Sequence, residues 1–182
     1  MIWFFAYGSL MWRPGFRYRE RRPALLRGYQ RAFCRLSFRH RGTPAAPGMV
    51  LGLAPGGACR GIAYGVAPRQ SEQALAYLDE REGAGYRRVK LPLQLEGGRQ
   101  AALTEAWVYL PEPSHPSHAP GLPERRIVEL LASGVGMSGA AHDYLRELLG
   151  ELARLGVEEP GLRAMLGKVE RYRAEYGLRA AD

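Results

Sequence analysis

The order of hydrophobic patterns along the 182-residue chain is the feature that most restricts its fold. Up to Leu110, apolar residues mostly alternate at period two, as in half-buried strands, whereas later segments show the spacing of amphipathic helices. Strands first and helices later are typical of an α+β domain rather than of alternating βαβ units. We therefore expect a mixed or antiparallel sheet of about six strands, curled into a barrel-like shape and flanked by helices.

One helical segment interrupts the strand patterns. Between the fourth and fifth strands, "SEQALAYLDERE" (71–82) has apolar residues at helical spacing, with Ser71 as an N-cap and with Gly83 and Gly85 as a stop. The last two strands form a hairpin around the turn "EGGR" (96–99). The predicted strands are 2–7, 32–38, 49–53, 58–66, 89–95 and 102–110.

The second half of the chain begins with a proline-rich connection, 111–123, which we expect to be an ordered loop or lid. Helical patterns follow: one over 127–132, one capped by Ser138, and one that starts at Pro160. A chain of this length buries one substantial core. We therefore predict a single domain, which is strand-rich over 1–110, has the loop at 111–123 and is helical over 124–176.

Composition argues against several classes of protein. No apolar run approaches the roughly 20 residues of a membrane helix, and no secretory signal is recognisable, so we expect a cytoplasmic protein with no membrane partner. Cys34 and Cys59 have no paired spacing, which indicates neither a disulfide framework nor a zinc site. The net charge of +8 comes from 24 arginines and two lysines that are scattered along the chain, so we expect no nucleic-acid binding.

The first apolar run leads directly into "YGSL" (7–10), the first of two segments that carry chemistry. A strand that stops here leaves the backbone N–H groups of Gly8, Ser9 and Leu10 without sheet partners. Such groups can hold an anion or a developing oxyanion. A tight turn after an edge strand would have the same pattern, so these residues alone leave both interpretations open.

The second segment is the end of the predicted helix, where Asp79, Glu80 and Glu82 gather. Carboxylates at a helix C-terminus oppose the helix dipole, so they indicate either a solvated face or a functional carboxylate that points inward. Glu82 precedes the Gly-x-Gly bend and is the best placed of the three to enter a cavity and transfer protons. In addition, Arg41 in "RHRG" is a candidate for binding a substrate carboxylate.

Both segments belong to a series of blocks that resembles the ChaC-type γ-glutamylcyclotransferases. The blocks occur in the order of that family and span most of the chain: "YGSLMWRPGF" (7–16), "HRG" (40–42), "PGMV" (47–50), "GIAYGV" (61–66), "YLDEREGAGY" (77–86) and "GMSGAAHDYL" (136–145). The first block combined with "LDEREGAGY" is specific. The resemblance implies a small barrel-like α+β fold. It also implies an enzyme that degrades glutathione to 5-oxoproline and cysteinylglycine without a metal or organic cofactor.

The resemblance also implies roles for individual residues. The substrate loop of the family falls on Tyr7, Gly8, Ser9 and Leu10, and its catalytic acid/base falls on Glu82. In the same way, Tyr109 resembles a family tyrosine near the substrate. The implied mechanism is intramolecular, because the α-amino group of the substrate attacks its own γ-carbonyl and no enzyme nucleophile is needed.

Several alternatives remain open at this point. Other γ-glutamyl amino acids or amines share the γ-glutamyl half of glutathione, and a non-catalytic regulatory protein of the same fold would need no inward Glu82. A hydrolytic triad of Ser9 with His142 is disfavoured, because "YGSL" lacks the second glycine of the Gly-x-Ser-x-Gly elbow. A metal site at His115 and His118, with His40 or His142, is also disfavoured, because cysteine and carboxylate partners are not nearby.

Overall fold

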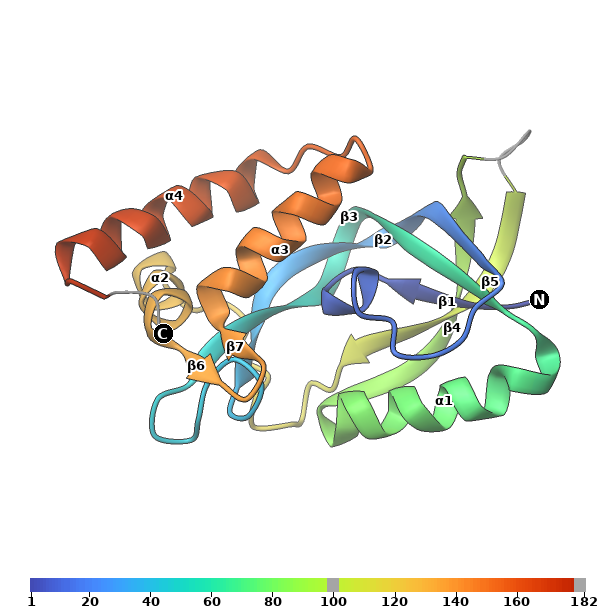
Figure 1. Ribbon diagram of the computed structural model, residues 1–182, viewed down its shortest axis with the longest axis horizontal. Helices are drawn as coiled ribbons and strands as arrows, with labels where there is room; N and C mark the ends of the chain where they lie inside the picture. Colours follow the sequence, from blue (N-terminus) through green and yellow to red (C-terminus); the bar gives the residue numbers. More distant parts are fainter. Residues whose placement is uncertain (98–101, 179–182) are drawn as a thin grey trace. The chain divides into compact units, whose positions relative to one another are not determined.

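The computed structural model describes residues 1–97 and 102–178, and it confirms the α+β class (Figure 1). The chain forms two compact units. The first unit consists of Met1–Ala32 and Leu53–His115, and the second consists of Phe33–Gly52 and the chain from Pro116 onward. The predicted single domain, with its boundaries at 110 and 123, stays a prediction.

Five strands close a barrel in the order β1-β3-β2-β4-β5, which confirms the predicted barrel-like mixed sheet. β1 pairs with β3 antiparallel and with β5 parallel, and β4 pairs antiparallel with both β2 and β5. Closure gives every strand two neighbours, so the sheet has no free edge. The strands are β1 (Ile2–Ala6), β2 (Glu20–Ser37), β3 (Gly48–Val66), β4 (Tyr86–Leu95) and β5 (Ala102–Pro111).

The barrel has fewer and longer strands than the sequence predicts. Segments 49–53 and 58–66 are parts of one strand, β3, although the intervening Pro55-Gly56-Gly57 is typical of a strand end. β2 begins at Glu20 rather than at residue 32. Its first residues do not alternate between apolar and polar, so the sequence does not predict a strand there, and pairing within the barrel extends the strand over them. Of the predicted turn at 96–99, Gly98 and Arg99 lie outside the described residues.

Apolar side chains from all five strands form the core of the first unit. Because successive side chains of a strand point to opposite faces, every second residue of a barrel strand faces inward. Burying each large apolar side chain contributes about 1.5–3 kcal/mol before conformational entropy is counted. The buried cluster consists of Trp3, Phe5, Tyr7, Ala24, Leu26, Leu53, Cys59, Ala63, Leu93, Leu95, Ala106, Val108 and Leu110.

Helix α1 (Pro68–Glu82) belongs to the first unit and ends where the sequence predicts. The residue that follows, Gly83, has a φ of 61°, in the left-handed region that favours glycine, and it ends the helix. The predicted N-cap is wrong. The helix begins earlier, with Pro68 in its first turn, and the Ser71 hydroxyl donates to the Pro68 carbonyl at 2.7 Å instead.

Three helices of the second unit pack against one another: α2 (Glu124–Ser133), α3 (Ala141–Arg154) and α4 (Pro160–Glu175) (Figure 1). The predicted cap Ser138 is wrong, because α3 begins after Ala140 and Ser138 forms a 2.9 Å hydrogen bond with His40 Nδ1. Ser138 lies in a short hairpin, β6 (Val135–Gly136) and β7 (Gly139–Ala140), that the sequence did not indicate. Among the described residues, no helix combines the length and apolar character that a membrane span requires.

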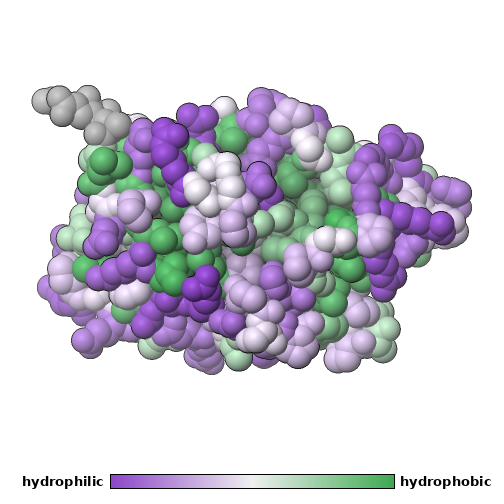
Figure 2. Space-filling model, turned by 180° about the vertical axis from the view of Figure 1, so that it is seen from behind, coloured by the Kyte–Doolittle hydropathy of each residue, from purple (hydrophilic) through white to green (hydrophobic). Residues whose placement is uncertain are grey.

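Charged side chains are dispersed over the surface. On the face drawn in Figure 2, strongly hydrophilic residues occupy several separate areas with apolar residues between them. Many arginines face an acidic partner within their own unit, and such exposed pairs contribute little to stability. Examples are Arg60–Glu96, Arg88–Asp79, Arg146–Glu170 and Arg163–Glu158.

Candidate active site

The chain leaves β1 at Ala6 and turns at Gly8 into a short 3-10 helix, η1 (Ser9–Met11). The strand therefore ends at Ala6, one residue before its predicted end at Tyr7. The N–H groups of Ser9 and Leu10 lie in the first turn of η1, where a helix offers its N–H groups no carbonyl of its own. Gly8 and Ser9 are partly exposed. This loop thus presents backbone donors close to the surface of the first unit.

Side chains of the barrel fix the backbone of this loop. Arg31 Nε donates to the Tyr7 carbonyl at 2.7 Å, and the Tyr64 hydroxyl donates to the Met11 carbonyl at 2.7 Å. The Tyr7 side chain is buried, and its hydroxyl donates to the Tyr109 carbonyl at 2.8 Å. The loop is therefore held at both of its ends by strands of the first unit.

The last turn of α1 carries Asp79, which joins the helix to two strands. One carboxylate oxygen of Asp79 accepts a hydrogen bond from the Tyr109 hydroxyl at 2.6 Å, and the other accepts one from Arg88 at 2.6 Å. Burial, with a further contribution from the Asp79 hydrogen bond, raises the pKa of Tyr109 well above its usual value of 10.0. Asp79 therefore anchors α1 to β4 and β5, which explains one of the three carboxylates at this helix end.

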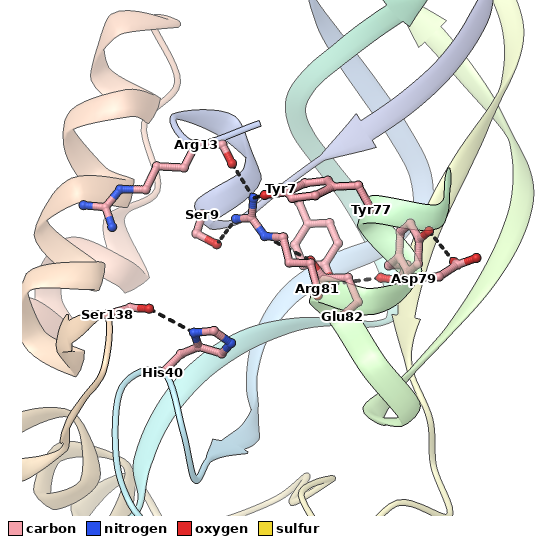
Figure 3. Close-up of polar contacts among 10 residues, drawn as sticks. Tyr7, Ser9, Arg13, His40, Tyr77, Asp79, Arg81, Glu82 and Ser138 are labelled. Carbon is pink, nitrogen blue, oxygen red and sulfur yellow. Dashed lines mark hydrogen bonds and ion pairs between the residues drawn. The ribbon is translucent and has the colours of Figure 1, made fainter. Parts of the chain in front are cut away.

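Arg81 and Glu82 lie together at the end of α1 (Figure 3). Arg81 Nη2 donates to the Ser9 hydroxyl at 3.1 Å, and Arg81 Nη1 donates to the Arg13 carbonyl. The Arg81 Nε atom lies 3.8 Å from a carboxylate oxygen of Glu82. The side chains of Arg81 and Glu82 are 19% and 21% exposed, so neither is closed off from solvent. The two segments that the sequence singles out therefore meet through Arg81.

Arg41 belongs to the second unit and is engaged there. Its guanidinium donates to the Ala140 carbonyl at 3.0 Å and to the Glu147 carboxylate at 3.0 Å. It also lies over the Tyr144 ring, 5.6 Å from the ring centre. Of the residues that the sequence singles out, Tyr7–Leu10, Glu82 and Tyr109 belong to the first unit and Arg41 to the second. The role of Arg41 as a ligand for a substrate carboxylate stays a prediction.

Comparison with known proteins agrees with these features. A family model described as ChaC-like protein matches residues 2–172. This chain belongs to the ChaC-like family.

This ChaC-like protein has curated relatives in bacteria and animals. It is 35% identical over 176 residues to the Escherichia coli (strain K12) protein named glutathione-specific gamma-glutamylcyclotransferase, a match that covers 96% of this chain and 75% of that protein. It is 34% identical over 151 residues to human glutathione-specific gamma-glutamylcyclotransferase 1, with 81% and 68% covered. The fold also matches the crystal structure of the yeast γ-glutamyl cyclotransferase specific to glutathione, with a TM-score of 0.85 and 25% identity over 94% of this chain and 99% of that chain.

Sequence reasoning missed Arg81 and Arg31, which fix the loop of this ChaC-like protein. Arg81 had one local signal, because it follows Tyr77 by one helical turn and donates to the Tyr77 hydroxyl at 3.2 Å. Arg31 had none, because nothing near it in the sequence indicates that its partner is the Tyr7 carbonyl.

The contacts of Ser9 also bear on the hydrolase alternative. A serine nucleophile needs a general base as the hydrogen-bond partner of its hydroxyl. The hydroxyl of Ser9 instead accepts a hydrogen bond from Arg81, a side chain that stays protonated and cannot act as a base. Among the described residues, moreover, no group of three histidines, cysteines or carboxylates is arranged to hold a metal ion.

Proposed function

We propose that this ChaC-like protein is a γ-glutamylcyclotransferase that degrades glutathione to 5-oxoproline and cysteinylglycine. One observation carries the proposal: Arg81 binds Ser9 of the loop after β1 and lies 3.8 Å from Glu82. Backbone donors suited to an oxyanion thus lie near a carboxylate suited to proton transfer. The relatives named for glutathione support the choice of substrate.

In the proposed reaction, the protein supplies no nucleophile. The α-amino nitrogen of the γ-glutamyl group attacks the γ-carbonyl carbon of the same molecule and closes a lactam ring. The bond from that carbon to the cysteine nitrogen breaks, and no water is consumed. Glu82 accepts a proton from the α-ammonium group, which frees the nitrogen lone pair for the attack, and returns a proton to the leaving nitrogen. Holding the substrate folded replaces an encounter between two molecules.

The loop Tyr7–Leu10 is the proposed binding site for the γ-glutamyl group. Its N–H groups would stabilise the negative charge that develops on the γ-carbonyl oxygen, and loss of one such donor typically costs about 100- to 1,000-fold in kcat. Support comes from Arg31 and Tyr64, because they fix the loop backbone before substrate arrives. Tyr109 is proposed to lie near the substrate, since its carbonyl holds the Tyr7 hydroxyl.

We also propose a cytoplasmic location for the enzyme. Glutathione keeps thiols reduced in the cytosol, so the proposed substrate is available there. Cys34 and Cys59 are buried thiols, which suits a reducing compartment.

Release of 5-oxoproline from glutathione, measured by mass spectrometry, tests the proposed function. The variants are Glu82→Gln and a matched control, Glu80→Gln, which changes an exposed glutamate in the same helical turn. The wild type and the control should form 5-oxoproline at equal rates, whereas Glu82→Gln should be at least about 100-fold slower. All three proteins should melt at the same temperature.

A parallel incubation with γ-glutamyl-alanine tests the substrate. Consumption of this dipeptide alone would keep the ring-closing chemistry and overturn the choice of glutathione. If neither compound yields 5-oxoproline, the enzymatic function is wrong and a regulatory role takes its place. Equal rates for the wild type and Glu82→Gln would remove the acid/base role of Glu82.

A further inference from the structure

Arg81 has several partners at the end of α1, although the proposed chemistry gives it no role (Figure 3). Two of its partners, the Ser9 hydroxyl and the Arg13 carbonyl, belong to the loop after β1. A third is the Tyr77 hydroxyl at 3.2 Å, one turn earlier on the same helix. The fourth is Glu82, at an ion-pair distance of 3.8 Å that exceeds hydrogen-bond length.

The chemistry of the guanidinium suits it to this arrangement. Its N–H donors lie in one plane at fixed angles, so contacts on two sides fix its orientation. At this site, Tyr77 holds the group from the helix while Ser9 and Arg13 hold it from the loop. Lysine carries its donors on one rotating ammonium group and would not reproduce the geometry.

The loop passes close to α1 at a second point, where it lies against Tyr77, a partner of Arg81. Gly15 has a φ of 74°, and a Cβ atom on it would lie 2.0 Å from the Tyr77 hydroxyl oxygen. Only glycine allows this approach. Phe16 follows, with its ring centre 6.5 Å from that of Tyr77. The segment after the 3-10 helix is therefore packed on the same helix whose last turn carries Glu82.

We propose that Arg81 is a positioning residue, which fixes the loop Gly8–Leu10 relative to the Glu82 end of α1. Its catalytic consequence rests on the proposed function, since the loop is there the oxyanion site and Glu82 the acid/base. Arg81 thereby sets the separation between the backbone donors and the proton acceptor. A change of about 1 Å in such a separation can lower a rate about 100-fold.

The partners of Arg81 also separate this role from simple stabilisation of the fold. Breaking a buried arginine–carboxylate pair is strongly destabilising, because it leaves a buried charge without compensation. Arg81 is 19% exposed, and its hydrogen bonds go to two hydroxyl groups and a carbonyl. Its loss should therefore release the loop locally and leave the barrel folded.

Two measurements on the full chain test the proposal. Hydrogen exchange, read by mass spectrometry, reports on the backbone of Gly8–Trp12, and steady-state kinetics with glutathione separate kcat from KM. The variants are Arg81→Met and Arg81→Lys. The control is Arg69→Met, at an exposed arginine near the start of the same helix.

In Arg81→Met we expect faster exchange confined to Gly8–Trp12. Its kcat should fall about 100-fold while KM changes by less than about threefold, because the loop is displaced rather than removed. Arg81→Lys should recover only part of kcat, and Arg69→Met should match the wild type in both measurements.

Three results overturn the proposal or limit it. Unchanged exchange in Gly8–Trp12 of Arg81→Met would show that Arg81 does not fix the loop, whatever the activity. Faster exchange throughout the protein, with a lower melting temperature, would make Arg81 an ordinary stabilising residue. If the wild type forms no 5-oxoproline while exchange still rises only in the loop, the proposed function fails, the catalytic consequence falls with it, and the structural link stands.

Discussion

Two arginines, one in each compact unit, show that the same type of side chain has different roles in this protein. Arg41 in the second unit is 5% exposed, and its donors reach a main-chain carbonyl and the Glu147 carboxylate. Arg81 in the first unit is 19% exposed and binds a hydroxyl group and a carbonyl of the loop after β1, together with the Tyr77 hydroxyl of its own helix. The Arg41 cluster thus keeps its guanidinium closed to water, whereas the Arg81 guanidinium stays within reach of solvent.

Two carboxylates in the last turn of α1 also differ in their contacts, although here the anchoring Asp79 is the more exposed, at 49%. Asp79 accepts from Tyr109 and Arg88 and so anchors the helix to the barrel. Glu82, three residues later, is 21% exposed, and Arg81 links it to the loop after β1. The two carboxylates at this helix end therefore have different roles. Substitution of Asp79 should affect stability, and substitution of Glu82 should affect turnover.

The largest expected effect is that of Glu82→Asp on turnover. The shorter side chain keeps its charge but moves the carboxylate by about 1 Å, which should lower kcat about 100-fold. Stability should not change, because the side chain is partly exposed. Steady-state assay of 5-oxoproline and urea unfolding check both parts, with Glu80→Asp as the control. Full activity in Glu82→Asp would contradict a role that depends on position.

A smaller effect, on stability, is expected for Arg41→Met. Removing one partner of a buried ion pair costs about 3–5 kcal/mol, and since Glu147 is 33% exposed we expect about 2 kcal/mol. Urea unfolding measures this loss. The control is Arg163→Met, at an exposed pair of the same unit, which should not alter stability measurably. A raised KM for glutathione at unchanged stability would instead support Arg41 as a ligand for the substrate.

Tyr109→Phe should have a still smaller effect, which depends on pH. Loss of the hydrogen bond to Asp79 should lower the free energy of unfolding by about 1.5 kcal/mol at pH 8. The pKa of Tyr109 is raised in the folded state, so this tyrosine contributes stability that is complete below pH 10 and decreases as pH rises further. The difference between the wild type and Tyr109→Phe should therefore shrink above pH 10.

Urea unfolding at pH 8 and above pH 10 measures this difference. Tyr18→Phe, at an exposed tyrosine of the first unit, is the control at pH 8. A constant difference across the two pH values would contradict the raised pKa of Tyr109 in the folded state.

The two regions also differ in how far the sequence predicted them. Locally encoded features were predicted: β1 stops before Gly8, and α1 stops at Gly83. Arg81 was missed because its partner Ser9 lies 72 residues away in sequence. Both serine caps were wrong because a hydroxyl has several possible partners, and tertiary contacts decided between them; Ser138, for example, binds His40. Residue patterns thus predict where an element ends better than which distant group a polar side chain meets.

The smallest expected effect concerns His142 in the second unit. The side chain is buried at the start of α3, and burial lowers its pKa below the usual 6.5. Arg146 and Arg173 lower it further, whereas Asp143 and Glu170 oppose them. The unfolded chain therefore binds a proton at this histidine more readily than the folded chain, so stability falls as pH drops below 6.5.

His142→Gln should make that fall less steep. Between pH 7 and 5.5, the wild type should lose up to about 1 kcal/mol more unfolding free energy than the variant does. Urea unfolding at the two pH values measures the difference, with His115→Gln of the first unit as the control. An equal loss in the wild type and His142→Gln would show that other groups of the second unit govern its response to acid. Because His142 lies in the unit that holds Arg41 rather than Glu82, turnover per folded molecule should stay the same.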